Sequence, residues 1–164
     1  MPLTSGSTNI TPPGTGTVCA LTPGRALLER LAVETEQRLY QADQLGMRYG
    51  ETTITDYNLL EIRLANLANI RVFHVPPIRE REFGYDWEWW IRVGSMPWTV
   101  LFLQAKRLNP KNGKYDSLGH KVPGTKQRQI DLLLQHATNF GGIPLYSFYN
   151  GPRPSVSAWN CPEY

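Results

Sequence analysis

Cysteine is scarce in this chain of 164 residues, which has only Cys19 and Cys161, one near each end. Two isolated cysteines form neither a disulfide framework nor a zinc site, and no Cys-x-x-Cys pair is present. The sequence leaves open whether the two residues pair with each other. The cystine-rich small domains and the cysteine-ligated zinc modules are therefore excluded as classes.

Long apolar runs are absent as well. No stretch of about 18 apolar residues exists, so no transmembrane helix is predicted. The N-terminus has neither a basic start nor a continuous apolar segment, which argues against a secretory signal. We therefore expect a cytoplasmic protein that does not interact with membranes.

Charge is low overall and unevenly distributed. Charged residues make up 19% of the chain and the formal net charge is +3, which excludes a strongly acidic calcium-binding protein. Between residues 104 and 128, seven Lys and Arg stand against one Asp, so this segment carries +6 and the rest of the chain −3. Such a segment is typical of a protein that binds a phosphate backbone, and a solvated loop is the alternative.

The pattern of apolar residues and turn signals predicts one mixed α/β domain at residues 22–150. Residues 1–21 are rich in Ser, Thr, Gly and Pro and predict a flexible tail, while residues 151–164 predict an irregular one. Helices are predicted from Thr22-Pro23 to Gly46, at about residues 55–69 and at about residues 126–139. Strands are predicted at residues 71–75, 85–93, 98–106 and 143–149.

The element order after the first helix is αβββαβ, which favours a mixed central sheet flanked by helices. On the second helix, Glu61 lies at the edge of an apolar arc. The arc consists of Tyr57, Leu60, Leu64, Leu67 and Ala68. A carboxylate beside a buried face is unusual, although a glutamate that reaches solvent from the helix edge is an equal alternative.

The strand at residues 85–93 alternates strictly between two kinds of side chain. Asp86, Glu88, Trp90 and Arg92 share one face, and Trp87, Trp89, Ile91 and Val93 share the other. We expect the second face to pack in the core against a helix. Trp90 is then the tryptophan that is placed to touch a ligand.

The following strand is predicted to pair antiparallel with this one because the connection is short. One register sets Asp86 opposite Lys106 and Glu88 opposite Gln104, and a shift by two residues sets Asp86 opposite Gln104. Either register collects Asp86, Glu88, Gln104 and Lys106 on one face. Hard cations such as Mg²⁺ take oxygen ligands of this kind, and a lysine nearby stabilises charge on a phosphate or positions the attacking water. Cross-strand salt bridging is the alternative.

These residues resemble the PD-(D/E)xK nuclease superfamily, in which an Asp precedes an E-x-K strand and a helix carries a further Glu. Here the elements are Asp86, Gln104-Ala105-Lys106 and Glu61, in an αβββαβ order that is also the superfamily's core. Gln104 stands where the E-x-K motif has its glutamate, and in this the chain resembles the Mrr-like branch of the superfamily. Over about residues 50–150, G-x-D-W-E-W-W and L-Q-A-K-R-L also resemble a bacterial family of uncharacterised domains assigned to this restriction-endonuclease-like fold.

The resemblance implies an Mg²⁺-dependent endonuclease that hydrolyses DNA, with Mn²⁺ able to substitute, in a setting such as defence against foreign DNA. Many such nucleases act as homodimers. The metal ligands it implies are Asp86, Gln104, the Ala105 carbonyl, Glu61 and Glu88. Lys106 would orient or activate the water, and the neutral Gln104 would weaken the metal site.

The DNA contacts expected from the basic segment and the following helix are Arg107, Lys111, Lys114, Lys126, Arg128 and Gln129. Gln129 occupies the place of a polar helper, and a solvent-facing helix residue is its alternative. Two other functions stay open for the whole chain. One is a nuclease-fold domain without catalysis that binds nucleic acid or a protein partner. The other is a tryptophan-rich carbohydrate-binding module, which the alternation at residues 85–93 disfavours.

Overall fold

The computed structural model describes residues 22–123 and 126–151. Both cysteines and the two predicted tails, apart from Gly151, lie outside the described residues. Helix α1 (Pro23–Gln44) begins where the sequence predicts. The side chain of Thr22 accepts a hydrogen bond from the backbone N–H of Arg25, and proline fills the first helical position. The residues it buries repeat at helical spacing, at Leu31, Thr35, Leu39 and Ala42.

Helix α2 (Glu51–Leu64) begins and ends earlier than predicted, because Gly50 rather than a threonine precedes its first turn. It also buries a different face. Its buried residues are Ile54, Thr55, Leu59 and Ile62. Leu60 and Leu64, from the arc predicted to be buried, are 54% and 70% exposed. The prediction of the buried face was therefore wrong, since α2 has apolar side chains on two arcs and the packing partners select between them.

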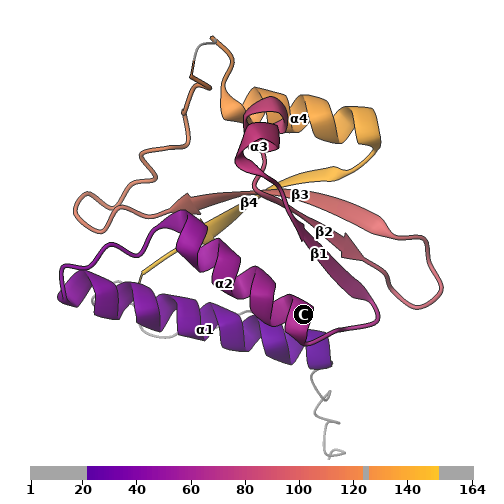
Figure 1. Cartoon of the computed structure of the whole chain (residues 1–164), viewed down its shortest axis with the longest axis horizontal. Coiled ribbons are helices and arrows are strands. Elements are labelled where there is room, and N and C mark those ends of the chain that lie inside the picture. Colours follow the sequence, from indigo (N-terminus) through magenta and orange to yellow (C-terminus); the bar gives the residue numbers. More distant parts are fainter. Residues whose placement is uncertain (1–21, 124–125, 152–164) are drawn as a thin grey trace, which may run out of the picture.

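Four strands form one mixed sheet in the order β1-β2-β3-β4. They are β1 (Ile70–His74), β2 (Trp87–Ile91), β3 (Thr99–Arg107) and β4 (Ile143–Tyr149). The first two pairings are antiparallel and the β3–β4 pairing is parallel. Figure 1 shows α1 and α2 on one face of the sheet and the two remaining helices on the other. The predicted mixed α/β core with flanking helices is thus confirmed.

The element order departs from the prediction at one place, where a short helix, α3 (Pro77–Phe83), separates β1 from β2. Pro76-Pro77 ends the preceding strand, and a proline also suits the first position of a helix. Helix α4 (Gln129–Phe140) lies beside α3 on the same face. None of the helices in the described ranges combines the length and apolar character that crossing a bilayer requires.

The core consists of two apolar clusters, one on each face of the sheet. The first joins Leu31 of α1 and Ile62 of α2 to Trp87 and Leu103 of the sheet, with Trp89 packed against it. The second lies beneath α3 and α4 and contains Val75, Tyr85, Phe102, Leu133 and Ala137. The alternation predicted for β2 therefore holds, because Trp87 and Trp89 pack against the helices α1 and α2.

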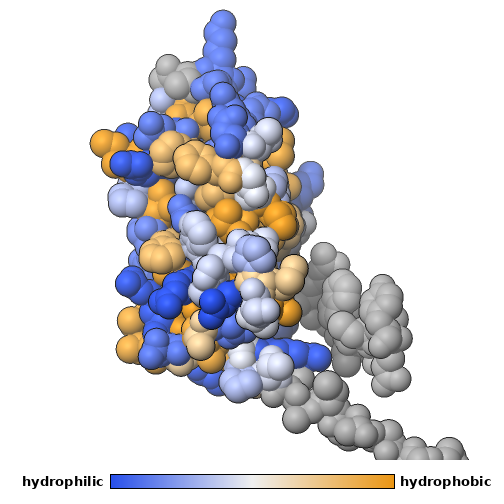
Figure 2. Space-filling model, turned by 90° about the vertical axis from the view of Figure 1, so that its right-hand side faces the viewer, coloured by the Kyte–Doolittle hydropathy of each residue, from blue (hydrophilic) through white to orange (hydrophobic). Residues whose placement is uncertain are grey.

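The connection between β2 and β3 extends from one end of the sheet (Figure 1). Figure 2 views that end of the molecule and shows apolar groups interspersed with hydrophilic ones. Two of the exposed apolar side chains of the connection are Val93 and Met96, at 75% and 64% exposure. The candidate site described below lies at the other end of β2, where the strand begins.

Candidate active site

Asp86 stands at the start of β2, directly after the turn that ends α3. Gly84 in this turn has a φ of +80°, and a Cβ atom there would lie 2.3 Å from the backbone oxygen of Gln129. Glycine is therefore required at this position. The backbone N–H of Asp86 donates to the carbonyl of Leu103 at 2.8 Å. The turn and this bond fix Asp86 beside the second half of β3.

The register between β2 and β3 is the second of the two that the sequence allows. Trp87 pairs with Leu103, so Asp86 lies level with Gln104. The carboxylate of Asp86 accepts a hydrogen bond from the backbone N–H of Ala105 at 2.5 Å. Asp86 is thereby attached to the middle residue of the Gln-Ala-Lys segment, and the register that sets it opposite Lys106 is wrong.

Lys106 is buried, with 4% of its surface exposed, and its ammonium group donates to the side-chain oxygen of Gln129 at 3.3 Å. The side-chain nitrogen of Gln129 donates in turn to the carboxylate of Glu80 at 3.1 Å. Gln129 is itself buried at the first position of α4. The structure therefore brings Gln129 to Lys106, and the solvent-facing alternative is wrong.

Gln104 is fully buried, at 0% exposure. Neither its amide oxygen nor its amide nitrogen has a hydrogen-bond partner within residues 22–123 and 126–151. A buried polar group without a partner costs roughly 1–3 kcal/mol, and native proteins contain few of them. An unpartnered amide oxygen beside Asp86 fits the ligand preference of a hard cation such as Mg²⁺.

Burial and neighbouring charges shift the acid–base behaviour of this cluster. The pKa of Asp86 is raised to about 7, mainly by burial and in part by the negative charges of Glu80 and Glu51, while the Ala105 hydrogen bond and the Lys106 charge oppose the shift. Burial lowers the pKa of Lys106, and the same carboxylates oppose that shift. The carboxylates of Asp86, Glu51 and Glu80 and the ammonium group of Lys106 together carry a charge of −2 when all four groups are ionised. A divalent cation would balance that charge.

Glu51 rather than the predicted Glu61 is the carboxylate that α2 brings to the site. It begins α2, and its carboxylate accepts the backbone N–H of Arg107, the last residue of β3, at 2.6 Å. Gly50 followed by an acidic residue was the signal for an earlier helix start. Glu80 was missed for a related reason, since it lies on the unpredicted helix α3.

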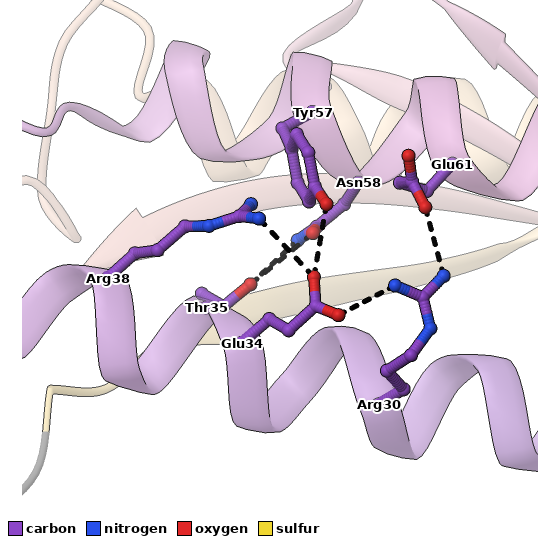
Figure 3. A network of polar contacts seen from close by, with 7 residues as sticks. All are labelled: Arg30, Glu34, Thr35, Arg38, Tyr57, Asn58 and Glu61. Carbon is purple, nitrogen blue, oxygen red and sulfur yellow. Dashed lines mark hydrogen bonds and ion pairs between the residues drawn. The ribbon is translucent and has the colours of Figure 1, made fainter.

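Glu61 lies ten residues further along α2, which corresponds to about 15 Å of helix. Its carboxylate binds the guanidinium of Arg30 on α1 at 2.9 Å, and Arg30 also binds Glu34 at 2.7 Å. Figure 3 shows this network, which joins the two helices. The structure does not bring Glu61 to Asp86, so Glu61 is not retained as a metal ligand.

Glu88 also takes part in contacts outside the Asp86 cluster. It pairs with Phe102 across the strands, and its two oxygens accept hydrogen bonds from Tyr85 at 3.0 Å and from the Trp90 indole at 2.8 Å. The Tyr85 hydroxyl also contacts the ring nitrogen of His136 at 3.1 Å. His136 of α4 packs among the rings of Phe83, Tyr85 and Phe102.

The described residues contain no group of three or more His, Cys, Asp or Glu side chains arranged to hold a metal ion. Amide and backbone carbonyl oxygens are not among those side chains, and they also bind hard cations. The oxygen donors available at the site are the carboxylate of Asp86, the unpartnered amide oxygen of Gln104 and the Ala105 carbonyl. This set is close to the predicted one without Glu61 and Glu88. A cation there would keep several positions for water or a phosphate oxygen, as Mg²⁺ often does.

A sequence profile described as a family of unknown function, DUF6615, matches residues 25–163. The chain belongs to the DUF6615 family. The matched segment runs from α1 beyond the end of β4, so it includes the Asp86–Lys106 cluster and both helices beneath the sheet. A search of curated proteins gives no match.

The connection between β3 and α4 of this DUF6615 chain carries the predicted basic segment. It leaves the end of β3 at which Lys106 lies (Figure 1). Its exposed lysines are Lys111, Lys114, Lys121 and Lys126. The two arginines predicted to bind DNA are already paired, because Arg107 binds Asp43 and Arg128 binds Asp131, each at 2.6 Å. The four lysines are thus the cations that remain available to a phosphate backbone.

Proposed function

We propose that this chain is a metal-dependent nuclease domain that hydrolyses DNA phosphodiester bonds. The observation that carries the proposal is the convergence of Asp86, Gln104 and Lys106 at one end of β2 and β3, with the Gln104 amide buried and unpartnered. The resemblance of these residues to the glutamine variant of the PD-(D/E)xK nucleases supports the same chemistry. The fold class agrees with it but does not distinguish it from other functions.

In this proposal, Asp86, the Gln104 amide oxygen and the Ala105 carbonyl hold Mg²⁺ or Mn²⁺. The bound ion supplies Lewis-acid polarisation of the phosphate and a lowered pKa of water. Lys106, held by Gln129, places a positive charge where the phosphate becomes more negative during attack by water. Glu51 and Glu80 add negative charge that favours a divalent cation.

DNA binding is assigned to the connection between β3 and α4. Its four exposed lysines lie in the segment that follows β3, the strand that carries Lys106, and they can neutralise phosphates of DNA bound there. Cutting both strands of a duplex requires two such sites, which a homodimer would supply. A role in defence against foreign DNA rests on the resemblance alone.

The alternative is a nuclease-fold domain that binds nucleic acid or a protein partner without cleaving DNA. Two features favour it, namely the neutral Gln104 in place of a carboxylate and the lack of three metal-binding side chains of the usual types among the described residues. Both reduce the affinity expected for a divalent cation.

A plasmid assay separates the two functions. Supercoiled DNA is incubated with the full chain and either Mg²⁺ or Mn²⁺, beside Asp86→Asn, Lys106→Ala and the control Asp56→Asn, an exposed carboxylate on α2. We expect nicked and linear DNA with the wild type and the control, and neither with the two site variants. A wild type that binds the plasmid and leaves it intact with both metals would support the alternative.

A further inference from the structure

An open groove of about 340 Å³ lies on the face of the sheet that also carries α3 and α4. Its wall consists of Arg71 and Phe73 from β1, Glu88 and Trp90 from β2, and Trp98 just before β3. Side chains alternate along β2, so Asp86 and Trp90 share this face and are separated by roughly 13 Å of strand. The groove is therefore distinct from the Asp86 cluster but lies on the same side of the sheet.

The aromatic rings of this groove are accessible and held in place. Phe73 is 47% exposed, and Trp90 and Trp98 are partly exposed. The indole N–H of Trp90 donates to one oxygen of Glu88 at 2.8 Å, and the other oxygen of Glu88 accepts from Tyr85 at 3.0 Å. Because aromatic side chains stack with flat rings, this preorganised wall is suited to a planar aromatic group.

Two arginines lie beside Trp98. The Cζ atom of Arg92 is 4.9 Å from the centre of the Trp98 ring, and that of Arg71 is 5.6 Å from it. Neither guanidinium forms an ion pair within residues 22–123 and 126–151, whereas Arg107 and Arg128 are each bound to an aspartate. Like charges near one ring repel each other, so an anion at this place would be stabilised.

The charges of the groove distinguish between the ligands that aromatic walls usually bind. Arg71 and Arg92 outweigh Glu88, whose two oxygens already accept hydrogen bonds. A cationic ligand is disfavoured, because guanidinium groups already occupy the cation–π positions at Trp98. A neutral sugar would gain nothing from the arginines. A ligand with both a flat ring and a negative charge uses the whole groove, and an unpaired nucleotide has this combination.

We propose that this groove binds an unpaired base of single-stranded DNA, stacked on the aromatic wall, with a neighbouring phosphate at Arg71 and Arg92. The proposal deepens the proposed function and rests on it for DNA as the substrate. The bases of an intact duplex are stacked on one another and do not enter such a groove. The protein should therefore favour DNA with an unpaired segment.

The experiment measures binding of the full chain to two strands by calorimetric titration in EDTA, without a dye whose ring could enter the groove. One strand is dodecathymidylate, and the other is an abasic strand with the same sugars and phosphates. We expect the strand with bases to bind roughly 5–100-fold more tightly, the ratio that base stacking on an aromatic side chain provides. Equal affinity for the two strands, or binding of neither, would overturn the proposal.

Matched variants locate the base. Trp98→Ala and Phe73→Ala each remove a ring from the wall, whereas Tyr40→Ala removes a ring that is 50% exposed on α1. We expect the first two to weaken dodecathymidylate at least fivefold and to leave the abasic strand unchanged, and the control to change neither. Circular dichroism checks folding, and Phe73→Ala on the edge strand decides the question if Trp98→Ala does not fold. A folded Phe73→Ala that keeps the wild-type preference for bases would contradict the assignment.

The phosphate contact has its own test. Arg71→Gln should weaken both strands and flatten the slope of log K against log salt by about 0.7, the contribution of one phosphate in a single strand. Arg30→Gln is the control, because Glu34 and Glu61 already pair with Arg30, and it should leave the slope unchanged. A slope unaffected by Arg71→Gln would remove the phosphate from this groove.

Two further outcomes separate this proposal from its neighbours. Binding of cellohexaose that Trp98→Ala abolishes, together with equal affinity for the two DNA strands, would assign the groove to a carbohydrate and refute the proposal. Failure of the nuclease proposal would appear differently, as intact plasmid with both metals beside a preserved preference for dodecathymidylate in EDTA. Cleavage that persists without any preference for bases would refute the groove alone.

Discussion

The backbone N–H of Ala105 donates a hydrogen bond to the carboxylate of Asp86 at 2.5 Å, across the ends of two neighbouring strands. The bond ties the carboxylate to the middle of the Gln-Ala-Lys segment. Because side chains alternate along β3, Gln104 and Lys106 project together towards α4, on either side of the residue that holds Asp86. The metal donors and the lysine are therefore positioned by one strand pairing.

Asp86 should make the metal-free protein less stable as the pH rises. Its folded pKa, about 7, lies above the ordinary value of 3.8, so the folded state binds the proton more tightly than the unfolded state. The resulting stabilisation is complete below about pH 4 and is lost as the pH rises through 7. The free energy of unfolding is measured with urea in the presence of EDTA. The value for Asp86→Asn minus that for the wild type should be roughly 2–4 kcal/mol larger at pH 8 than at pH 4. An equal difference between the two proteins at both pH values would argue against a buried Asp86.

Glu51 and Glu61 lie on the same helix but should respond differently to neutralisation. Glu51→Gln removes a carboxylate that faces Asp86 and Lys106, so we expect the affinity for Mn²⁺ to fall roughly 10–100-fold. Glu61→Gln breaks only the partly exposed pair with Arg30 and should cost about 0–1 kcal/mol of stability without changing metal affinity. Calorimetric titration with Mn²⁺ compares the two, and the reverse ranking would restore Glu61 to the site.

Gln129 should act as a positioning residue for Lys106. Gln129→Ala removes the hydrogen bonds to Lys106 and Glu80, which leaves the ammonium group less well oriented. We expect kcat for DNA cleavage to fall roughly 10–100-fold with little change in KM. Gln135→Ala, an exposed glutamine on the same helix, is the control. A purely structural role for Gln129 would lower Tm and leave kcat of the folded fraction intact.

The four exposed lysines of the β3–α4 connection should determine the salt dependence of DNA binding. Each phosphate that a lysine neutralises contributes about −0.9 to the slope of log K against log salt. Changing Lys111, Lys114, Lys121 and Lys126 together to Gln should flatten that slope by several units in fluorescence anisotropy titrations. Arg128→Gln should have a smaller effect, because Asp131 already pairs with Arg128. An unchanged slope in the fourfold variant would place the DNA elsewhere.

Features encoded by local sequence were predictable. Thr22-Pro23 marks the start of α1, and the strict alternation at residues 85–93 assigned Trp87 and Trp89 to the core. The short connection between two strands also predicted that Asp86 lies beside the Gln-Ala-Lys segment. It left two strand registers possible, of which the structure shows one. Each of these depends on neighbours in sequence or on one adjacent strand.

Features that depend on tertiary packing were not predictable in the same way. The register was settled by the α3 turn, in which Gly84 packs against the backbone of Gln129. Glu51 and Glu80 joined the site because α2 begins early and α3 exists at all. The exposed arc of α2, with Leu60 and Leu64, shows that apolar periodicity alone does not identify which side of a helix meets the sheet.

We propose above all that Asp86 holds a divalent cation where β2 begins and β3 ends. Electron paramagnetic resonance of Mn²⁺ at pH 8 tests it most directly, since the signal of the free ion falls as the protein binds it. The wild type should remove one Mn²⁺ per chain, Asp56→Asn should do the same, and Asp86→Asn should leave the free-ion signal unchanged. Equal binding by the wild type and Asp86→Asn would contradict the account.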